Sequence, residues 1–475
     1  MKAMARYDAA STGRRLRSWN PPASGPNTSI ENIEKLRSRN RDAGRNEWAA
    51  EAATRLRVVD MVGTGIVARP KTKRVALKQT LSGLWEKSLK EIDADGTNNF
   101  YGMQALACHS WEESGEVFAR IRARRMSDPV AVPIQVQLLE ADMVPMLNTD
   151  TYTGLPTGNR IRYGIELDPI GRRVAYWVYK SHPGDNIAST FDASLLTRVP
   201  ADEMIHVYQA KRPGALRGVP DGTSSIVRMK TVSDFDDAVT EKAKIQNLFA
   251  GVIHRPAPTA GQLGTDPLTG QIIEYAENNM PMVGLEPGAV IELAPGEEMT
   301  FSNPPATGVG YNDYTRVQNL AIASGRGVPY EMLAGDIVNV SDRTLRVIIQ
   351  NYRRAIEQKQ WLVLIPKLCQ AIWDAWVDAA ALIGLISLSD VDEAKRVQWS
   401  PQAWAYIHPV QDVASKVAEI DAGITSRDMV ISSRGDDPDE VDESRAESQA
   451  REKLLGLVAA VLANPKIKAE LEKLM

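Results

Sequence analysis

The sequence predicts an α+β protein that is mainly helical. Two long stretches, residues 223–250 and 343–386, carry apolar side chains at intervals close to 3.6 residues, which is typical of packed helices. Residues 130–210, which precede both stretches, contain short runs rich in β-branched and aromatic residues, and this composition favours strands. A chain of 475 residues is too long for one compact core, so we expect roughly two to four folded units.

The overall charge and the cysteine content narrow the class of protein. The net charge is −4, but the first 75 residues are rich in Arg and Lys whereas residues 390–443 are rich in Asp and Glu, so the two ends should face different surroundings. The two cysteines, Cys108 and Cys369, suggest neither a disulfide framework nor a metal-ligand pair. Without an evident signal peptide, this composition fits a reducing cytoplasm.

One apolar stretch is long enough to be compared with a membrane span. Residues 361–386 contain Lys367, Asp374 and Asp378, each of which would cost several kcal/mol in hydrocarbon, and Pro366 interrupts the run. We therefore expect a buried core helix and no membrane partner.

The N-terminal region should pass from an extended arm into a helix. Residues 1–29 mix arginines with prolines, which disfavours a helix. Thr28 and Glu31 have the spacing of a capping box, so a helix is predicted to open there. We expect a break at Gly44 and an end before Gly63.

Residues 76–126 predict helices punctuated by Gly96 and then a strand. In that strand arginines alternate with apolar residues, and the arginines are Arg120, Arg122, Arg124 and Arg125. A solvated face is the favoured interpretation. Contact with acidic neighbours or with DNA phosphate is the alternative.

The β-rich region should contain a hairpin. A Pro- and Gly-containing turn at residues 168–171 separates the last two of three predicted strands, which are residues 134–139, 161–167 and 174–179. Glu203 and His206 have the residue types of an acid/base pair, but no nucleophile lies nearby, so a pair at a sheet edge is favoured.

Residues 223–250 predict a single helix of about 40 Å. Its acidic residues are Asp234, Asp236, Asp237 and Glu241. Three carboxylates within four residues suggest a metal site, but these positions point apart on a helix, so a solvated acidic face is favoured and no metal is expected.

Residues 251–308 are rich in proline and glycine, with short strands predicted at 271–275 and 289–293. A helix should begin at Asn312 or Asp313 and end near Gly325, where a Gly- and Pro-rich turn follows. After a polar loop, a long helix should start at Arg343 and be kinked at Pro366.

Beyond residue 387, the sequence predicts a strand at 397–399 and then a helix and turn over 410–432. Residues 436–443 lack the spacing of a calcium-binding loop and are expected to form a solvated acidic linker. A terminal helix containing Leu454 to Leu462 should follow.

Several motifs together resemble one protein family. The stretch from Ile322 to Asp336, followed by a polar loop and Arg343, resembles the lambda-type family of tailed-bacteriophage portal proteins. Further motifs occur in the family's order over about residues 15–450: Trp19-Asn20-Pro21, His206-Val207-Tyr208, Arg212-Pro213-Gly214, Arg217-Gly218-Val219-Pro220 and Gly423-Ile424-Thr425-Ser426-Arg427.

The resemblance implies a portal fold with long stem helices, a β-containing wing, a small clip insertion and a helical C-terminal crown. In order, the implied parts are an N-terminal arm and helix (1–75), the first part of the wing (76–222), a stem helix (223–250), the clip (251–308), a second stem helix and turn (309–334), a tunnel loop (335–342), the long helix and wing return (343–400) and the crown (401–475).

The resemblance also implies a mechanical function. A homo-oligomeric ring, usually of twelve subunits, would sit at one vertex of the capsid in the virion, after assembly in the host cytoplasm. Double-stranded DNA would pass through its channel during packaging, retention and ejection. The implied protein partners are the terminase large subunit, the major capsid protein and the head–tail connector. No cofactor is expected.

The tunnel loop is the main candidate site. Its residues would be Ile337, Val338, Asn339, Val340, Ser341 and Asp342, and the channel face of the stem would carry Asp234, Asp237 and Glu241. Apolar bulk without Lys or Arg before Arg343 suits a sliding contact with DNA, since cations would hold phosphates. An ordinary connection between helices at a subunit interface is the alternative.

No constellation of residues predicts catalysis, because the five histidines lack partner spacing and no Ser/His/Asp or zinc pattern occurs. Two other functions stay open. One is a metal-dependent nuclease of the packaging system that uses Asp234, Asp236 and Asp237. The other is a virion structural protein that forms no ring.

Overall fold

The structure is a computed structural model that describes residues 24–185, 195–248, 310–338, 340–404 and 409–456, together with Ser18, Pro21 and two short strands within 249–309. The chain divides into two compact units. Unit 1 comprises Met1–Thr223 and Arg326–Met475, and unit 2 comprises Ser224–Gly325.

Unit 1 begins with four helices: α1 (Ile33–Asn46), α2 (Trp48–Val62), α3 (Val75–Ser88) and α4 (Phe100–Ser114). The predicted capping box is wrong, because Thr28–Ile30 form a single 3-10 turn without a side-chain cap. The predicted break at Gly44 is also wrong. The break lies at Glu47 instead, whose backbone is extended. Its carbonyl accepts from the amides of Ala50 and Glu51, and α2 starts there. Gly44 stays helical, where a Cβ would lie 2.9 Å from a carboxylate oxygen of Glu113.

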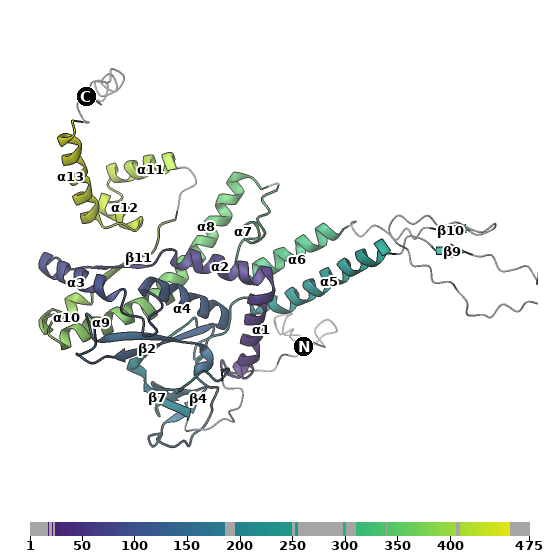
Figure 1. The fold of residues 1–475 in the computed structure, drawn as a ribbon, viewed down its shortest axis with the longest axis horizontal. Coiled ribbons are helices and arrows are strands. Elements are labelled where there is room, and N and C mark those ends of the chain that lie inside the picture. The colour runs from purple at the N-terminus through teal and green to yellow at the C-terminus, as the bar shows by residue number, and fades with distance from the viewer. Residues whose placement is uncertain are drawn as a thin grey trace, which may run out of the picture. The chain divides into compact units, whose positions relative to one another are not determined.

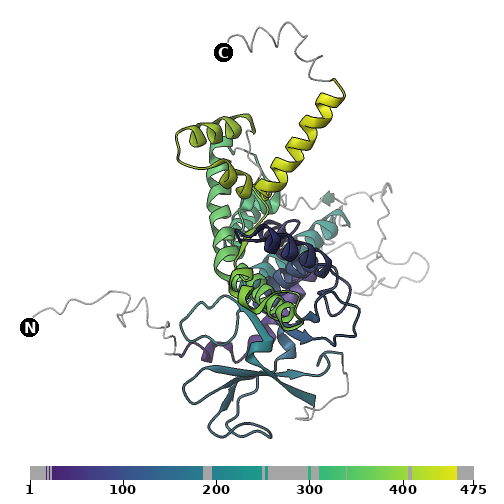
Figure 2. The same cartoon turned by 90° about the vertical axis from the view of Figure 1, so that its left-hand side faces the viewer.

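Two antiparallel sheets follow. The first has the order β3 (Ile134–Leu139), β2 (Glu116–Ala123), β8 (Met204–Tyr208). The second has the order β4 (Arg160–Arg162), β5 (Ile165–Leu167), β6 (Arg173–Tyr179), β7 (Leu196–Pro200). Buried residues of both sheets form one core, including Phe118, Leu139, Tyr176, Val178 and Val199. Helices α4 and α9 lie on the opposite side of the first sheet, so β2 is covered on both faces over its first half (Figure 1, Figure 2).

The predicted strand at 161–167 is in fact a hairpin. Tyr163 and Gly164 have positive φ angles of 54° and 79°, so the chain reverses there and β4 pairs with β5. An Asn or Asp before the glycine would have signalled this turn, but tyrosine rarely takes this conformation. The predicted hairpin with its turn at residues 168–171 is confirmed between β5 and β6, with the Asp168 side chain accepting from the Ile170 and Arg172 amides.

The predicted long helix is a continuous helical run from Asp342 to Leu382. It consists of α8 (Asp342–Lys359), a π-helical segment (Gln360–Cys369) and α9 (Gln370–Leu382). Pro366 lies inside the π-helical segment, whose wider turn accommodates a residue that has no N–H to donate. Trp373 and Trp376 are fully buried against Trp85, which makes this run the centre of the core of unit 1. Among the described residues, no helix is both long and apolar enough to cross a membrane.

The last part of unit 1 returns to the N-terminal helices. Strand β11 (Val397–Ser400) is confirmed and pairs with β1 (Val67–Pro70). It follows the short helix α10 (Val391–Ala394) and precedes α11 (Pro409–Asp421), α12 (Arg427–Ser433) and α13 (Pro438–Leu454). The predicted acidic linker at 436–443 is wrong: Asp437 caps α13, and the carboxylates that follow occupy its first turns, where the helix dipole stabilises them. The predicted terminal helix beyond residue 456 lies outside the described residues.

Unit 2 contains a pair of helices, α5 (Thr223–Leu248) and α6 (Tyr311–Arg326), and the antiparallel strands β9 (Val252–His254) and β10 (Glu298–Thr300). Each helix has one terminal residue that belongs to unit 1. Phe235 of α5 packs against Tyr311 and Tyr314 of α6. Helix α6 begins at Tyr311, one or two residues before the predicted start at Asn312 or Asp313. The strands predicted at 271–275 and 289–293 lie outside the described residues.

Candidate functional site

The loop predicted to face DNA connects α7 (Tyr330–Ala334) to α8. Gly335, with φ +67°, ends α7, and Asp336 then folds the loop by accepting from the Tyr330 hydroxyl at 3.2 Å and from the Val338 amide at 3.2 Å. Ile337 and Val338 are both 65% exposed. Asn339 lies outside the described residues. The loop therefore presents apolar side chains to solvent, while the Asp336 carboxylate forms hydrogen bonds within the loop and to α7.

The end of this loop is the start of α8. The Ser341 hydroxyl accepts from the Thr344 amide at 3.2 Å, so Ser341 caps the helix. Asp342 is the first helical residue, which corrects its assignment to the loop, and it pairs with Arg346 at 2.6 Å. Arg343 is exposed. The loop itself contains no cationic side chain, as the sequence requires.

The other end of α8 meets a partly buried group of charges in unit 1, here called the clasp: Arg57, Glu112, Asp221 and Lys359. Arg57 donates to Glu112 at 3.0 Å and to Asp221 at 2.7 Å. Lys359 donates to Glu112 at 2.8 Å and also to Asp221. Arg57 donates in addition to the backbone carbonyl of Arg326 at 3.0 Å. The clasp thus joins α8 to the residues before α5 and at the end of α6.

The burial of Glu112 determines the electrostatics of the clasp. Glu112 is only 4% exposed, and burial raises its pKa to about 7 even though Arg57 favours the charged form. The nearby charge of Asp221 raises it further. Burial and the charge of Arg57 lower the pKa of Arg326 to about 10. Sequence reasoning missed this group, because Glu112 and Lys359 are 247 residues apart.

A second buried cluster surrounds Glu116, which is fully buried at the start of β2. Arg37 and Arg217 pair with it, and the Gly218 amide donates to it at 2.7 Å. Burial would raise the pKa of Glu116, but Arg217, Arg37 and His206 outweigh burial and hold it well below its usual value. The carboxylate is therefore charged and structural.

His206, which the sequence suggested as half of an acid/base pair, belongs to this second cluster. Its Nε2 lies 3.0 Å from Glu116, and burial lowers its pKa to about 4 even though Glu116 favours the protonated form. Glu203 ends a short 3-10 turn before β8 and is exposed. The structure thus pairs His206 with Glu116, on the neighbouring strand β2.

The acidic residues of α5 lie on two different faces of the helix. Asp236 accepts from the Tyr311 hydroxyl of α6 at 2.8 Å. Asp234, Asp237 and Glu241 are exposed and lie at intervals of three and four residues, so they share one face of the helix. Asp236 is turned away from that face, and the three neighbouring aspartates do not converge on one ion.

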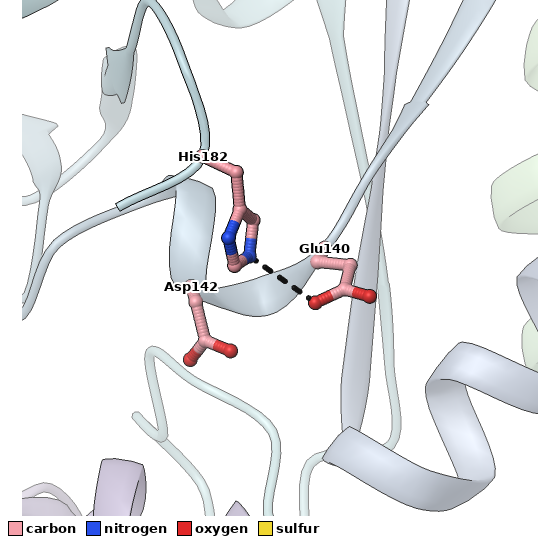
Figure 3. A group of neighbouring side chains, drawn as sticks. All are labelled: Glu140, Asp142 and His182. Carbon is pink, nitrogen blue, oxygen red and sulfur yellow. Dashed lines mark ion pairs between the residues drawn. The ribbon is translucent and has the colours of Figure 1, made fainter. Parts of the chain in front are cut away.

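One group of side chains in unit 1 has ligand types suited to a metal: Glu140, Asp142 and His182, whose ligand atoms all lie within 4.8 Å of one another (Figure 3). His182 lies 3.3 Å from Glu140. Arg41 pairs with both carboxylates, and Arg37 adds a further contact to Asp142. Because arginines already compensate the carboxylates, we interpret the group as an ion-pair cluster that ties the end of β3 to α1.

Comparison with known proteins places these features in a family. A sequence model of the family described as "Phage portal protein, lambda family" matches residues 12–360. The chain is 24% identical over 438 residues to a probable portal protein of Halomonas phage phiHAP-1, which covers 89% of this chain and 82% of that protein. It is 22% identical over 489 residues to the portal protein of Escherichia phage N15, covering 94% of this chain and 89% of that protein.

A similar match is found to portal protein B of Escherichia phage lambda, at 22% identity over 473 residues, covering 90% of this chain and 86% of that protein. Among solved structures, a chain from the neck of an empty GTA particle aligns with a TM-score of 0.46 and 14% identity, covering 90% of this chain and 99% of that chain. The family match extends over well more than half of the sequence, from the N-terminal arm to the end of α8. The chain belongs to the lambda family of phage portal proteins.

Proposed function

We propose that this portal protein assembles into a closed homo-oligomeric ring, of about twelve copies by family resemblance, at one capsid vertex of the virion. Double-stranded DNA passes through its channel during packaging and ejection. The ring binds the terminase motor during packaging and the head–tail connector afterwards. Residues 251–308, the proposed clip, would carry these docking contacts.

The observation that carries the proposal is the chemistry of the loop between α7 and α8. It presents Ile337 and Val338 to solvent, and no lysine or arginine lies between Gly335 and Asp342. Repeated around a ring, such a loop limits diffusion of the duplex sterically while offering its phosphates no strong electrostatic partner. This combination suits passage that does not depend on DNA sequence.

The exposed acidic face of α5 supports the same function. Asp234 is paired with Lys230 at 2.7 Å and Glu241 with Lys244 at 3.4 Å, whereas Asp237 is exposed and forms no ion pair with another described residue. Because two of its three carboxylates are paired with lysines, a channel face with this composition would attract phosphates little. Phe235, Val317 and Leu320 are 37%, 58% and 43% exposed, and such apolar surface on a helix pair favours burial against neighbouring copies.

The loop is best tested at Val338, because changing Ser341 would also remove the cap of α8. Val338→Lys adds one cation per subunit at an exposed position, so it should leave rings intact and impair DNA translocation or retention. Val338→Ser is the matched control, since it removes the apolar side chain without adding charge. The measurements are ring formation and the length of packaged DNA. Normal packaging by Val338→Lys rings would remove this loop from the DNA path.

A further inference from the structure

A row of arginines lies on one side of β2, outside every site described above. Side chains two residues apart on a strand share a face, so Arg120 and Arg122 continue the side of β2 that begins with Glu116 and Phe118. Phe118 is buried between the two sheets, whereas Arg120, Arg122 and the following Arg124 are partly exposed. We call these three residues the arginine row.

The hydrogen-bond partners of Arg122 and Arg124 are side-chain amides, although the carboxylates of Glu91, Asp93 and Asp128 line the same hollow as Arg124. Arg120 is opposite Gln137 and Arg122 is opposite Gln135 in the register of β2 and β3. Arg122 donates through Nε to Gln137 at 2.8 Å, and Arg124 donates to Gln135 at 2.6 Å. Within the described ranges, no aspartate or glutamate forms an ion pair with any of the three arginines.

This contrasts with two other partly buried arginines of unit 1. Arg41 pairs with Glu140 and Asp142, and Arg198 pairs with Glu166. The Cα atoms of alternate residues on a strand lie roughly 7 Å apart. Arginines at such positions therefore bring their positive charges close together, and these charges repel one another. Burial lowers the pKa of Arg122, and the charges of Arg120 and Arg124 lower it further, with a small opposing effect of Asp95. An anion bound along the row would remove this repulsion.

We propose that the arginine row binds the phosphate backbone of double-stranded DNA. The row is linear and partly exposed, so it matches a ligand with negative charges repeated along a line. Arginine is suited to phosphate because its donors form a planar fork. Guanidinium groups that contact phosphates do not read base edges, so the contact is independent of sequence.

This site goes beyond the proposed channel and differs from it in chemistry. The loop at residues 335–341 carries no cation and would let DNA slide, whereas the arginine row would hold it. The two sites also lie on different elements of unit 1, β2 and the α7–α8 connection. Binding at the row requires neither a closed ring nor the loop, so the two proposals can fail separately.

The test is binding of a fluorescent 30-base-pair duplex of arbitrary sequence to the purified full-length protein at several salt concentrations. The triple variant Arg120→Gln, Arg122→Gln, Arg124→Gln should weaken binding at low salt about tenfold or more. It should also reduce the slope of log K against log salt by about 2 to 3, because each lost phosphate contact reduces it by about 0.9. The matched control is Arg39→Gln, Arg160→Gln, Arg172→Gln, which removes the same charge from exposed positions. It should leave the slope nearly unchanged.

A triple lysine variant of the row keeps the charge. It shows whether weak binding by the glutamine variant comes from the lost charge or from misfolding. It should retain most of the salt slope, and its thermal stability should match that of the wild type. Equal slopes for the wild type and the glutamine variant would overturn the proposal. The proposal would also be overturned if polyglutamate binds as tightly as the duplex and depends on the same three arginines. The ligand of the row would then be an acidic protein.

Discussion

Replacing Glu112 with glutamine should remove part of the pH dependence of folding stability. The buried carboxyl has a pKa of about 7 in the folded protein, against an ordinary value of 4.5. Between these values the folded state binds a proton that the unfolded state has lost, so the contribution of Glu112 to stability decreases as the pH rises and is gone above pH 7. Proton linkage predicts that this contribution to the free energy of unfolding decreases by about 2 kcal/mol between pH 5.5 and pH 8.

The assay is urea unfolding at both pH values, followed by tryptophan fluorescence, since Lys359 of the clasp lies over the ring of Trp111. Between pH 5.5 and pH 8, the free energy of unfolding should fall by about 2 kcal/mol more in the wild type than in Glu112→Gln. Glu51→Gln is the control, because Glu51 is exposed and pairs only with Arg55 on the same helix among the described residues. Parallel pH curves for the wild type and Glu112→Gln would refute the account of the clasp.

Two further predictions concern the core and a turn of unit 1. Trp373→Ala should destabilise the protein by about 3–5 kcal/mol because Trp373 is fully buried, whereas Trp361→Ala, at a side chain 52% exposed, should cost much less; similar unfolding midpoints for the two variants would contradict the assigned core. Gly164→Ala should destabilise the protein by more than about 2 kcal/mol, since its φ is +79° and a Cβ would lie 2.4 Å from the carbonyl oxygen of Pro145. Gly171→Ala has a similar φ but an open surrounding, so it should cost about 1 kcal/mol in thermal unfolding, and equal losses at both glycines would rule out the close contact.

Patterns that depend on neighbouring residues were predictable from the sequence. The period of the apolar residues identified α5 and the run from α8 to α9, and Gly63 correctly ended α2. The alternation of arginine with apolar residues correctly predicted β2. In each case the local signal and the packing of the folded chain agree.

Failures occurred where tertiary contacts decided the local structure. Gly44 reads as a helix break, yet its missing side chain makes room for Glu113 of α4. Tyr163 reads as a strand residue, yet it takes a positive φ in the β4–β5 turn, where its hydroxyl donates to the Asn27 carbonyl at 2.9 Å. No periodic signal contains this information.

The candidate site was predictable only in part, for the same reason. The composition of the loop at 335–341 is visible in the sequence, as is the acidic face of α5. The clasp and the glutamine partners of the arginine row are not, because charged residues far apart in the chain become neighbours only after folding. Asp342 was assigned to the loop rather than to α8 because helix boundaries are uncertain by one or two residues in any sequence-based assignment.

The most direct test of the central claim is electron microscopy of the purified full-length protein at micromolar concentration and several salt concentrations. The account predicts closed rings of identical subunits with a central channel, because the exposed apolar residues of α5 and α6 would be covered by neighbouring copies. Particles that remain monomers or dimers under every condition would contradict it.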